Sequence, residues 1–237
     1  MSKETSAEWF DKSWNPISGR CPNKCTDLQG EAYCYMWRKG GIADRFKKTH
    51  DHPLCLNETT LRKVPKSGRI LVGSSTDMFC DEVSTNWLRE VFYQVYKNED
   101  KALFTFLTKK PKRYKDLISQ RFLMPLLAWY GTTYDGTEGT KNNIAILKTM
   151  KDYDFKFNKF VSFEPLLANP FGIKLDGIDW IIIGADSRKG KPKPPDKWAD
   201  YLVHEAWRNM AKVFVKNNYR WKYELKELPE YKRSELA

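Results

Sequence analysis

The sequence predicts an α/β fold, a single-domain partial (βα)6-7 TIM-like barrel of parallel strands, and three observations lead to it. Short, continuously apolar segments alternate with stretches of helical periodicity, the pattern of buried parallel strands joined by right-handed crossovers. Six or seven such units in about 215 residues fit a curled sheet better than a doubly wound one. No Gly-x-Gly-x-x-Gly turn follows any strand, which disfavours a dinucleotide-binding fold.

The predicted strands are rich in β-branched and aromatic residues, and each ends in a polar or glycine-containing turn. A shorter strand around Trp14–Ile17 is expected to precede them. Parallel strands gather their functional groups at their carboxyl ends. The six main strands are predicted at Ile70–Gly73, Leu103–Thr108, Leu127–Thr132, Phe160–Glu164, Trp180–Gly184 and Val213–Lys216.

Amphipathic stretches between the strands predict helices, because apolar residues recur in them at helical spacing. Ser84 or Thr85 can cap the first helix, and Pro111 suits the first turn of the second. A further helix is expected at Cys34–Lys48. Residues 1–217 are predicted to form the barrel domain, and 218–237 a charged extension that is a peripheral helix or tail. The four main helices are predicted at Ser84–Tyr96, Pro111–Phe122, Lys141–Met150 and Lys197–Met210.

The composition is that of a soluble globular protein. Hydrophobic residues make up 41% and charged residues 30% of the 237, which argues against disorder. There is no apolar run of the roughly 20 residues that cross a bilayer and no secretory signal, so we expect a cytoplasmic protein without membrane association. The net charge of +11 favours either a polyanionic partner or simply a well-solvated basic surface. Its local concentrations are Lys109–Lys115 and Arg188–Lys197.

Cys21, Cys25 and Cys34 are the strongest chemical signal, because they fall within fourteen residues. In a cytoplasmic chain such a group indicates metal binding or redox chemistry rather than disulfides. Three thiolates can bind three irons of a cubane cluster, or they can bind zinc together with His50 or His52. A third alternative is that the thiols have no ligand. The remaining two cysteines, Cys55 and Cys80, are interpreted as structural or incidental.

Motifs along most of the chain resemble a known family. Trp14-Asn15-Pro16, the three cysteines and Cys34-Tyr35 resemble the opening of a phage- and prophage-associated family of three-Cys-motif proteins that are similar to radical S-adenosylmethionine enzymes. The resemblance then continues in order to about residue 216. Its further segments are Gly73–Phe79, Phe106–Pro111, Phe160–Leu167, Asp176–Gly184 and Phe214–Lys216.

The resemblance implies a [4Fe-4S] cluster on Cys21, Cys25 and Cys34, with one iron left for S-adenosylmethionine. An external electron donor would reduce the cluster, and the cofactor would yield a 5′-deoxyadenosyl radical. The expected substrate is a nucleic acid or nucleotide. The usual spacing in such enzymes is Cys-x3-Cys-x2-Cys, so Thr26–Ala32 is interpreted as an insertion that bears on whether the fourth iron stays open.

The residues at the predicted strand ends are the candidates for cofactor binding. Glu164 follows a buried strand, where a charge needs a partner, whereas Lys109 could equally be a solvated basic turn. Small residues at 73–77 allow close approach of a ligand, or they simply cap the next helix. Two other hypotheses remain: a nucleic-acid-binding module with a structural zinc site, and a degenerate barrel that keeps a cluster without catalysis. The cofactor-binding set is Tyr35, Gly73, Ser74, Ser75, Asp77, Thr108, Lys109, Glu164, Asp186 and Lys216.

Overall fold

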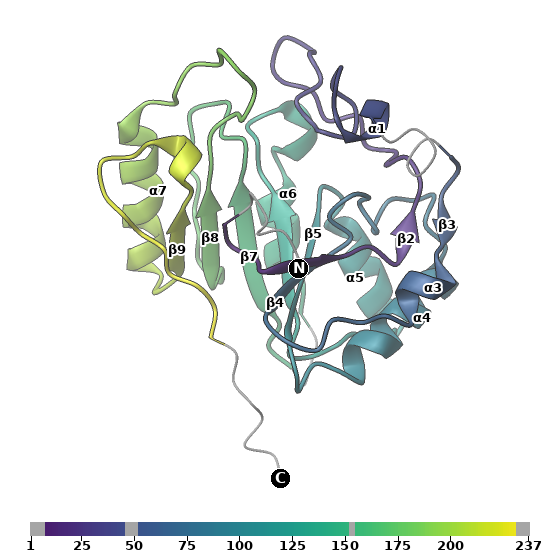
Figure 1. The fold of residues 1–237 in the computed structure, drawn as a ribbon. Coiled ribbons are helices and arrows are strands. Elements are labelled where there is room, and N and C mark those ends of the chain that lie inside the picture. The colour runs from purple at the N-terminus through teal and green to yellow at the C-terminus, as the bar shows by residue number, and fades with distance from the viewer. Residues whose placement is uncertain (1–7, 46–51, 152–154, 231–237) are drawn as a thin grey trace.

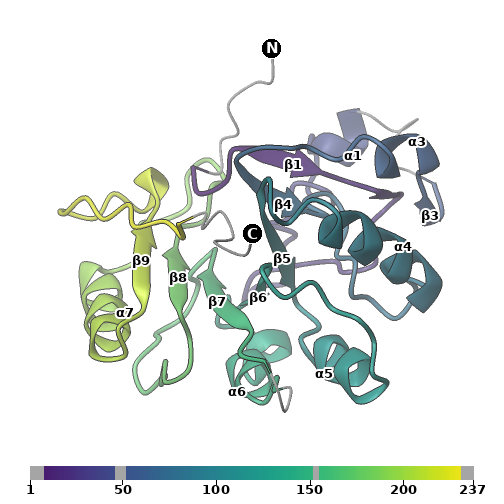
Figure 2. The same ribbon diagram turned by 90° about the horizontal axis from the view of Figure 1, so that it is seen from below.

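The computed structural model describes residues 8–45, 52–151 and 155–230, and its central feature is one curled sheet of seven parallel strands (Figure 1). The sheet has the order β1-β4-β5-β6-β7-β8-β9, so its strands lie side by side in the order in which they occur along the chain, with β2 and β3 outside it. Seen along the strands, the sheet curls into a half-barrel (Figure 2). The predicted α/β fold with a partial barrel is therefore confirmed.

Each predicted strand is present with limits that differ by at most three residues from those expected, and the limits of β5 are the same as predicted. The short early strand also forms and pairs with β4, from Lys12 opposite Ile70 to Trp14 opposite Val72. A small antiparallel pair, β2 (Ile17–Ser18) with β3 (Cys55–Leu56), was not predicted because two residues carry no periodicity. The sheet strands are β1 (Lys12–Trp14), β4 (Arg69–Val72), β5 (Leu103–Thr108), β6 (Trp129–Thr133), β7 (Asn158–Phe163), β8 (Trp180–Ile183) and β9 (Lys212–Val215).

The four main predicted helices cover the convex face of the sheet (Figure 2). The Ser84 hydroxyl accepts a hydrogen bond of 3.2 Å from the Trp87 amide, as expected for the cap of the first. These helices are α4 (Thr85–Tyr96), α5 (Lys112–Ser119), α6 (Asn143–Lys148) and α7 (Asp196–Arg208). Shorter helical turns are α1 (Ile42–Arg45), α3 (Glu58–Leu61), η1 (Glu138–Thr140) and η2 (Asn217–Tyr219).

The continuous helix expected at Cys34–Lys48 is wrong for its described part. The Cys34 carbonyl accepts hydrogen bonds from the amides of Trp37 and Arg38, which closes a turn rather than a helix. A Cβ at Gly41 would lie 2.2 Å from the Tyr35 carbonyl oxygen, so the chain folds back too tightly here for any other residue. Only α1 follows, and residues 46–48 lie outside the described residues.

Two apolar cores lie on opposite faces of the sheet, since side chains alternate along each strand. On β4, Ile70 and Val72 join the larger core under the helices, whereas Leu71 points into the half-barrel. The inner core is built around aromatic rings in edge-on and tilted contact, with Trp9 5.7 Å from Trp180 between ring centroids. It fills the amino-terminal part of the half-barrel and comprises Trp9, Phe10, Leu71, Phe160, Trp180, Ile182 and Phe214.

The described end of the chain covers the last strand of the sheet. The Val215 amide donates to Leu225 and the Glu227 amide donates to Val213, so this segment runs antiparallel along β9. No helix forms between 220 and 230, so of the two alternatives, peripheral helix or tail, this part is an extended tail, and it shields the sheet edge. Across the described ranges, no helix has the length and apolar character to span a membrane.

Candidate functional site

A cavity of about 830 Å³ lies at the carboxyl ends of the central strands. Its wall unites the three clustered cysteines with residues that follow β4, β5, β7 and β8. Of the sequence-predicted site residues, it includes Cys21, Cys25, Cys34, Tyr35, Gly73, Ser74, Ser75, Asp77, Thr108, Lys109, Glu164 and Asp186. The remaining one, Lys216, lies behind the wall and bonds to Glu164.

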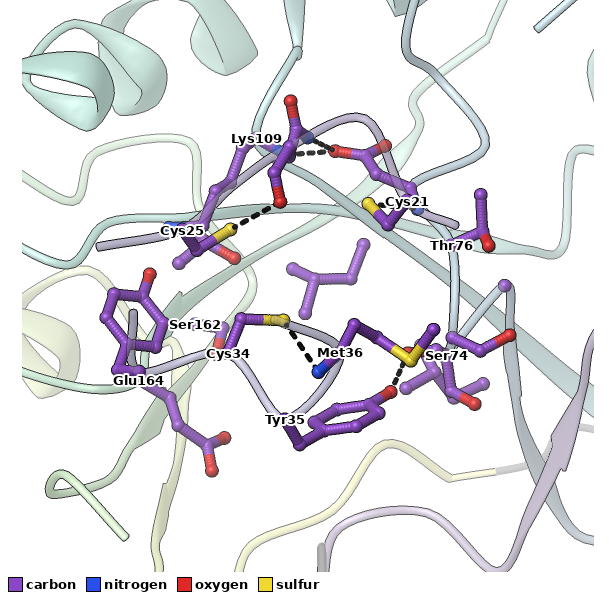
Figure 3. A pocket seen from close by; sticks show the side chains of 18 of the residues that line it. Cys21, Cys25, Cys34, Tyr35, Met36, Ser74, Thr76, Lys109, Ser162 and Glu164 are labelled. Carbon is purple, nitrogen blue, oxygen red and sulfur yellow. Dashed lines mark hydrogen bonds between the residues drawn. The ribbon is translucent and has the colours of Figure 1, made fainter. Parts of the chain in front are cut away.

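The three thiols enter the cavity from different sides, with their sulfur atoms turned toward its centre (Figure 3). The thiols of Cys25 and Cys34 lie near enough to shift each other's pKa, and the Cys25 thiol donates a 3.6 Å hydrogen bond to the Asn23 carbonyl oxygen. Cys21 stands opposite, and its sulfur accepts a 3.4 Å hydrogen bond from the Asp77 amide. Within the described ranges, the side chains as placed form no group of three that would hold a metal ion.

Hydrogen bonding between thiols gives the cysteines different acidities. The hydrogen bond from Cys25, together with the Met36 amide and the Lys109 ammonium, lowers the pKa of Cys34 to about 7. Burial acts in the opposite direction but is outweighed. The same thiol pair, together with burial, raises the pKa of Cys25 well above its ordinary value. Cys34 is therefore the most readily ionised thiol of this pair, which matters because the thiolate is the form that binds metals.

Cys80 was interpreted from sequence as incidental, but its thiol contacts Cys21. It is 1% exposed, lies outside the cavity wall and hydrogen-bonds to the Cys21 sulfur from behind. This bond is the largest influence that lowers the pKa of Cys21, and it raises the pKa of Cys80. No local pattern could have signalled the pair, because the two residues lie on different loops. His52, the zinc ligand considered above, is not part of the cavity wall, and His50 lies outside the described residues.

Asp77 is a buried crosslink between the loops after β4 and β5. Its carboxylate accepts hydrogen bonds from the Thr108 hydroxyl at 2.7 Å and from the Lys109 amide at 2.9 Å. The Asn23 amide group, from the cysteine loop, donates a third at 2.8 Å. Burial raises the pKa of Asp77, although these hydrogen bonds oppose the shift. The oxygens of Asp77 are thus largely engaged inside the protein.

The turn at Gly73–Ser75 brings main chain to the cavity surface. Gly73 has φ +77°, and a Cβ there would lie 2.6 Å from Met78 Cγ, so both conformation and space require glycine. The side-chain oxygen Oδ1 of Asn15 accepts hydrogen bonds from the Ser74 hydroxyl at 3.2 Å and the Ser75 amide at 3.0 Å. The Tyr35 hydroxyl donates to the Ser74 carbonyl oxygen (Figure 3), which ties this turn to the cysteine loop.

Two ion pairs occupy the wall. The Lys109 ammonium meets Asp135, which also accepts a 2.5 Å hydrogen bond from the Tyr33 hydroxyl. Burial favours a raised pKa for Asp135, but Lys109 and the hydroxyl donors outweigh it and hold the pKa below its ordinary range. Glu164 meets Lys216, so two residues predicted separately are partners.

The eight-residue gap between Cys25 and Cys34 forms a hairpin that is fixed to the far side of the barrel. Thr26 and Ala32 pair as its base, and Asp27 beyond them accepts a 2.5 Å bond from the Arg188 guanidinium. Arg188, on the loop after β8, also bonds to Asp186 at 2.6 Å. The side chains of Asp27 and Arg188 are 3% and 12% exposed. The network is completed by Lys191, which contacts both Asp27 and Glu31.

Several residues of this site were absent from the sequence prediction. Asn15 lies within a motif that carries the family resemblance, so its place in the site could have been predicted from the sequence. Asp27, Tyr33 and Asp135 carried no local signal, because each is defined by a partner more than 100 residues away.

Comparison of the chain with curated proteins and with solved structures finds no match. A protein-family model, however, matches residues 4–234, which is nearly the whole chain. The chain therefore belongs to the family described as protein of unknown function (DUF5131).

Proposed function

We propose that this protein is a radical S-adenosylmethionine-type enzyme that binds a [4Fe-4S] cluster through Cys21, Cys25 and Cys34. The observation that carries the proposal is the meeting of these three thiols in one cavity at the carboxyl ends of a parallel half-barrel. Parallel barrels bear their active sites at this end. When bound, such a cluster supplies the electron that cleaves S-adenosylmethionine to a 5′-deoxyadenosyl radical, with an external donor as the source.

The donor set fits this group in its chemistry. Iron–sulfur clusters are held by thiolates, and the three thiols face a shared space, two of them near enough to shift each other's pKa. One thiol ionises near neutral pH, so its conversion to a ligand requires little free energy. Because the thiols as placed do not yet form a metal-binding group, cluster loading requires the cysteine loop to draw them together.

The chain's own residues bind, orient and shield the cofactor. The cavity volume of about 830 Å³ falls within the range of small-molecule sites. The turn at Gly73–Ser75 offers main-chain groups at close range, which suits the amino acid moiety of S-adenosylmethionine. Glu164 remains 24% exposed in its pair with Lys216 and can accept a hydrogen bond from a ligand hydroxyl or ammonium. The inner aromatic core closes the opposite end against water.

One observation favours a second candidate function. Cys80 supplies a fourth thiol beside Cys21, and four thiolates are a common structural zinc set. In that case the protein is a nucleic-acid-binding module with a structural zinc site. A barrel that keeps its cluster but has lost catalysis is distinguished from the enzyme by its failure to bind S-adenosylmethionine.

Anaerobic reconstitution with iron and sulfide, followed by visible absorption and metal analysis, separates these functions. We expect a brown protein whose iron content is lost in Cys21→Ala, Cys25→Ala and Cys34→Ala. Cys55→Ala is the matched control, because Cys55 is exposed and bonds only to Ser18 among the described residues. Stoichiometric zinc that depends on Cys80, with no iron bound, would overturn the proposal of a radical S-adenosylmethionine-type enzyme.

A cofactor readout completes the test. S-adenosylmethionine should change the electron paramagnetic resonance spectrum of the reduced protein and release 5′-deoxyadenosine slowly. If S-adenosylmethionine does not change the spectrum, the result would favour a barrel that keeps its cluster but has lost catalysis.

A further inference from the structure

The basic segments of the sequence follow the carboxyl ends of strands, at the edge of the sheet that also carries the cavity. Lys110 and Lys112 follow the carboxyl end of β5, and Lys189 follows that of β8, on the other side of the half-barrel. All three side chains are exposed, and none forms an ion pair within the described chain. Because parallel strands end at one edge, runs that are distant in sequence flank one opening.

Two arginines stand at the mouth itself. Arg38 and Arg45 belong to the wall of the cavity and come from the segment that follows Cys34. The Arg45 side chain donates a 3.4 Å hydrogen bond to the Gly41 carbonyl oxygen. Neither guanidinium has a carboxylate partner among the residues that the structure describes.

Most other charged side chains of the wall have a partner of opposite charge. Lys109 pairs with Asp135, Glu164 with Lys216 and Asp186 with Arg188, while Asp77 is saturated with hydrogen bonds. The two mouth arginines therefore leave an excess of positive charge where a ligand enters. Guanidinium groups are suited to phosphate because their planar donors match its oxygens in pairs.

We propose that Arg38 and Arg45 form a phosphate-binding lip, and that the protein binds single-stranded nucleic acid across it. Lys110, Lys112 and Lys189 continue the track on both sides, which fits a chain of phosphates better than one isolated phosphate. The cavity admits a single unstacked base and not a duplex, and Tyr33 and Tyr35 in its wall offer aromatic rings for stacking. The proposal that the inserted base also reacts rests on the proposed function. The proposal that the protein binds the strand does not.

Fluorescence anisotropy of the purified full chain with a fluorescein-labelled 20-nucleotide strand of mixed sequence tests the lip. Each phosphate contact to a single strand contributes about 0.7 to the slope of log K against log salt. Arg38→Ala/Arg45→Ala should therefore lower this slope by about 1.4 and weaken binding about 25-fold at 0.1 M salt. Arg38→Lys/Arg45→Lys keeps the charges and should retain the slope.

Arg62→Ala/Arg208→Ala is the matched control. Both arginines are exposed and lie outside the cavity wall, and their loss changes the net charge equally; Arg62 also lies 3.9 Å from Glu58, an exposed contact. This variant should bind the strand within about threefold of wild type, since long-range charge is screened over about 10 Å. DNA and RNA strands of the same sequence are compared: binding of either supports the proposal, and the tighter one identifies the substrate.

Three results would overturn the proposal. The first is that the wild type does not bind the strand at 50 mM salt, and the second is that the control variant loses as much affinity for the strand as the lip variant. The third result is a lip variant that still binds the strand but no longer binds S-adenosylmethionine. The last would assign the arginines to the carboxylate of the cofactor. Failure of cluster formation, by contrast, would defeat the proposed enzyme and leave strand binding intact.

Discussion

Replacement of Arg188 by alanine tests whether the ion network holds the cysteine hairpin in place. Arg188 bonds to Asp27 on the hairpin and to Asp186 on its own loop, with both carboxylates at least nine-tenths buried. Its removal leaves two negative charges without their main partner. The Lys191 ammonium, 3.2 Å from Asp27, remains as partial compensation.

The size of the effect follows from this burial. Loss of one partner from a buried ion pair costs about 3–5 kcal/mol, and the residual Lys191 contact places the expected value near the lower end. For a chain of 237 residues, about 3 kcal/mol corresponds to a fall in Tm of roughly 6–12 °C if unfolding is global. If the hairpin opens by itself, its amide exchange should instead accelerate about 100-fold.

Both readouts are accessible on one preparation. Thermal unfolding by circular dichroism reports the global change, and hydrogen exchange at the amides of Gln29 and Glu31, which donate to Asp27, reports the local one. Lys189→Ala is the control, because this neighbour is exposed and carries the same charge without an ion pair in the described chain. If the Arg188 variant and the Lys189 variant have the same Tm and the same amide exchange rates, the network does not hold the hairpin.

Further predictions concern individual side chains of the cavity. In the metal-free protein, iodoacetamide should modify Cys34 with a midpoint near pH 7, because the thiolate forms above its pKa; a midpoint above pH 8.5 would contradict the thiol–thiol bond. Cys80→Ala should keep its iron yet shift the cluster potential to more negative values, since a sulfur loses a hydrogen bond; an unchanged potential in a redox titration, as in Cys55→Ala, would refute this. Glu164→Ala should weaken S-adenosylmethionine binding by about 10- to 150-fold in calorimetry without loss of iron, and wild-type affinity would remove Glu164 from the site. Asp135, whose pKa is lowered, stabilises the fold above about pH 4 and loses this contribution as the pH falls, so Asp135→Asn should flatten the decline in urea-unfolding free energy between pH 6 and about pH 3; a decline as steep as in wild type would contradict it.

The sheet was predictable because its strands leave a signal within a few residues. Segments such as Trp180–Ile183 are buried on both faces, so continuous apolar character suffices to place them. The expected helix after Cys34 failed because two local features outweigh helical periodicity: the hydrogen bonds to the Cys34 carbonyl, and the tight contact at Gly41. Neither is visible in residue spacing.

The site was partly predictable for a topological reason. Glu164 and Thr108 were identified because they end strands, and parallel strands bring their ends together whatever the loops do. The partners that set their chemistry were not identified. Which carboxylate meets Arg188, or which thiol meets Cys21, depends on how distant loops pack, and a charged or sulfur-containing residue has many candidate partners in the chain.

The hairpin that carries the cysteines is fixed by a residue made much later. Asp27 and Arg188 are 161 positions apart, so at synthesis rates of 5–20 residues per second the anchor follows the hairpin by about 8–32 s. During that interval the thiols have no cavity around them and are open to oxidants and to any metal that prefers sulfur. On the proposed function, a cluster on these thiols can therefore be enclosed by the cavity only after translation of the barrel is nearly complete.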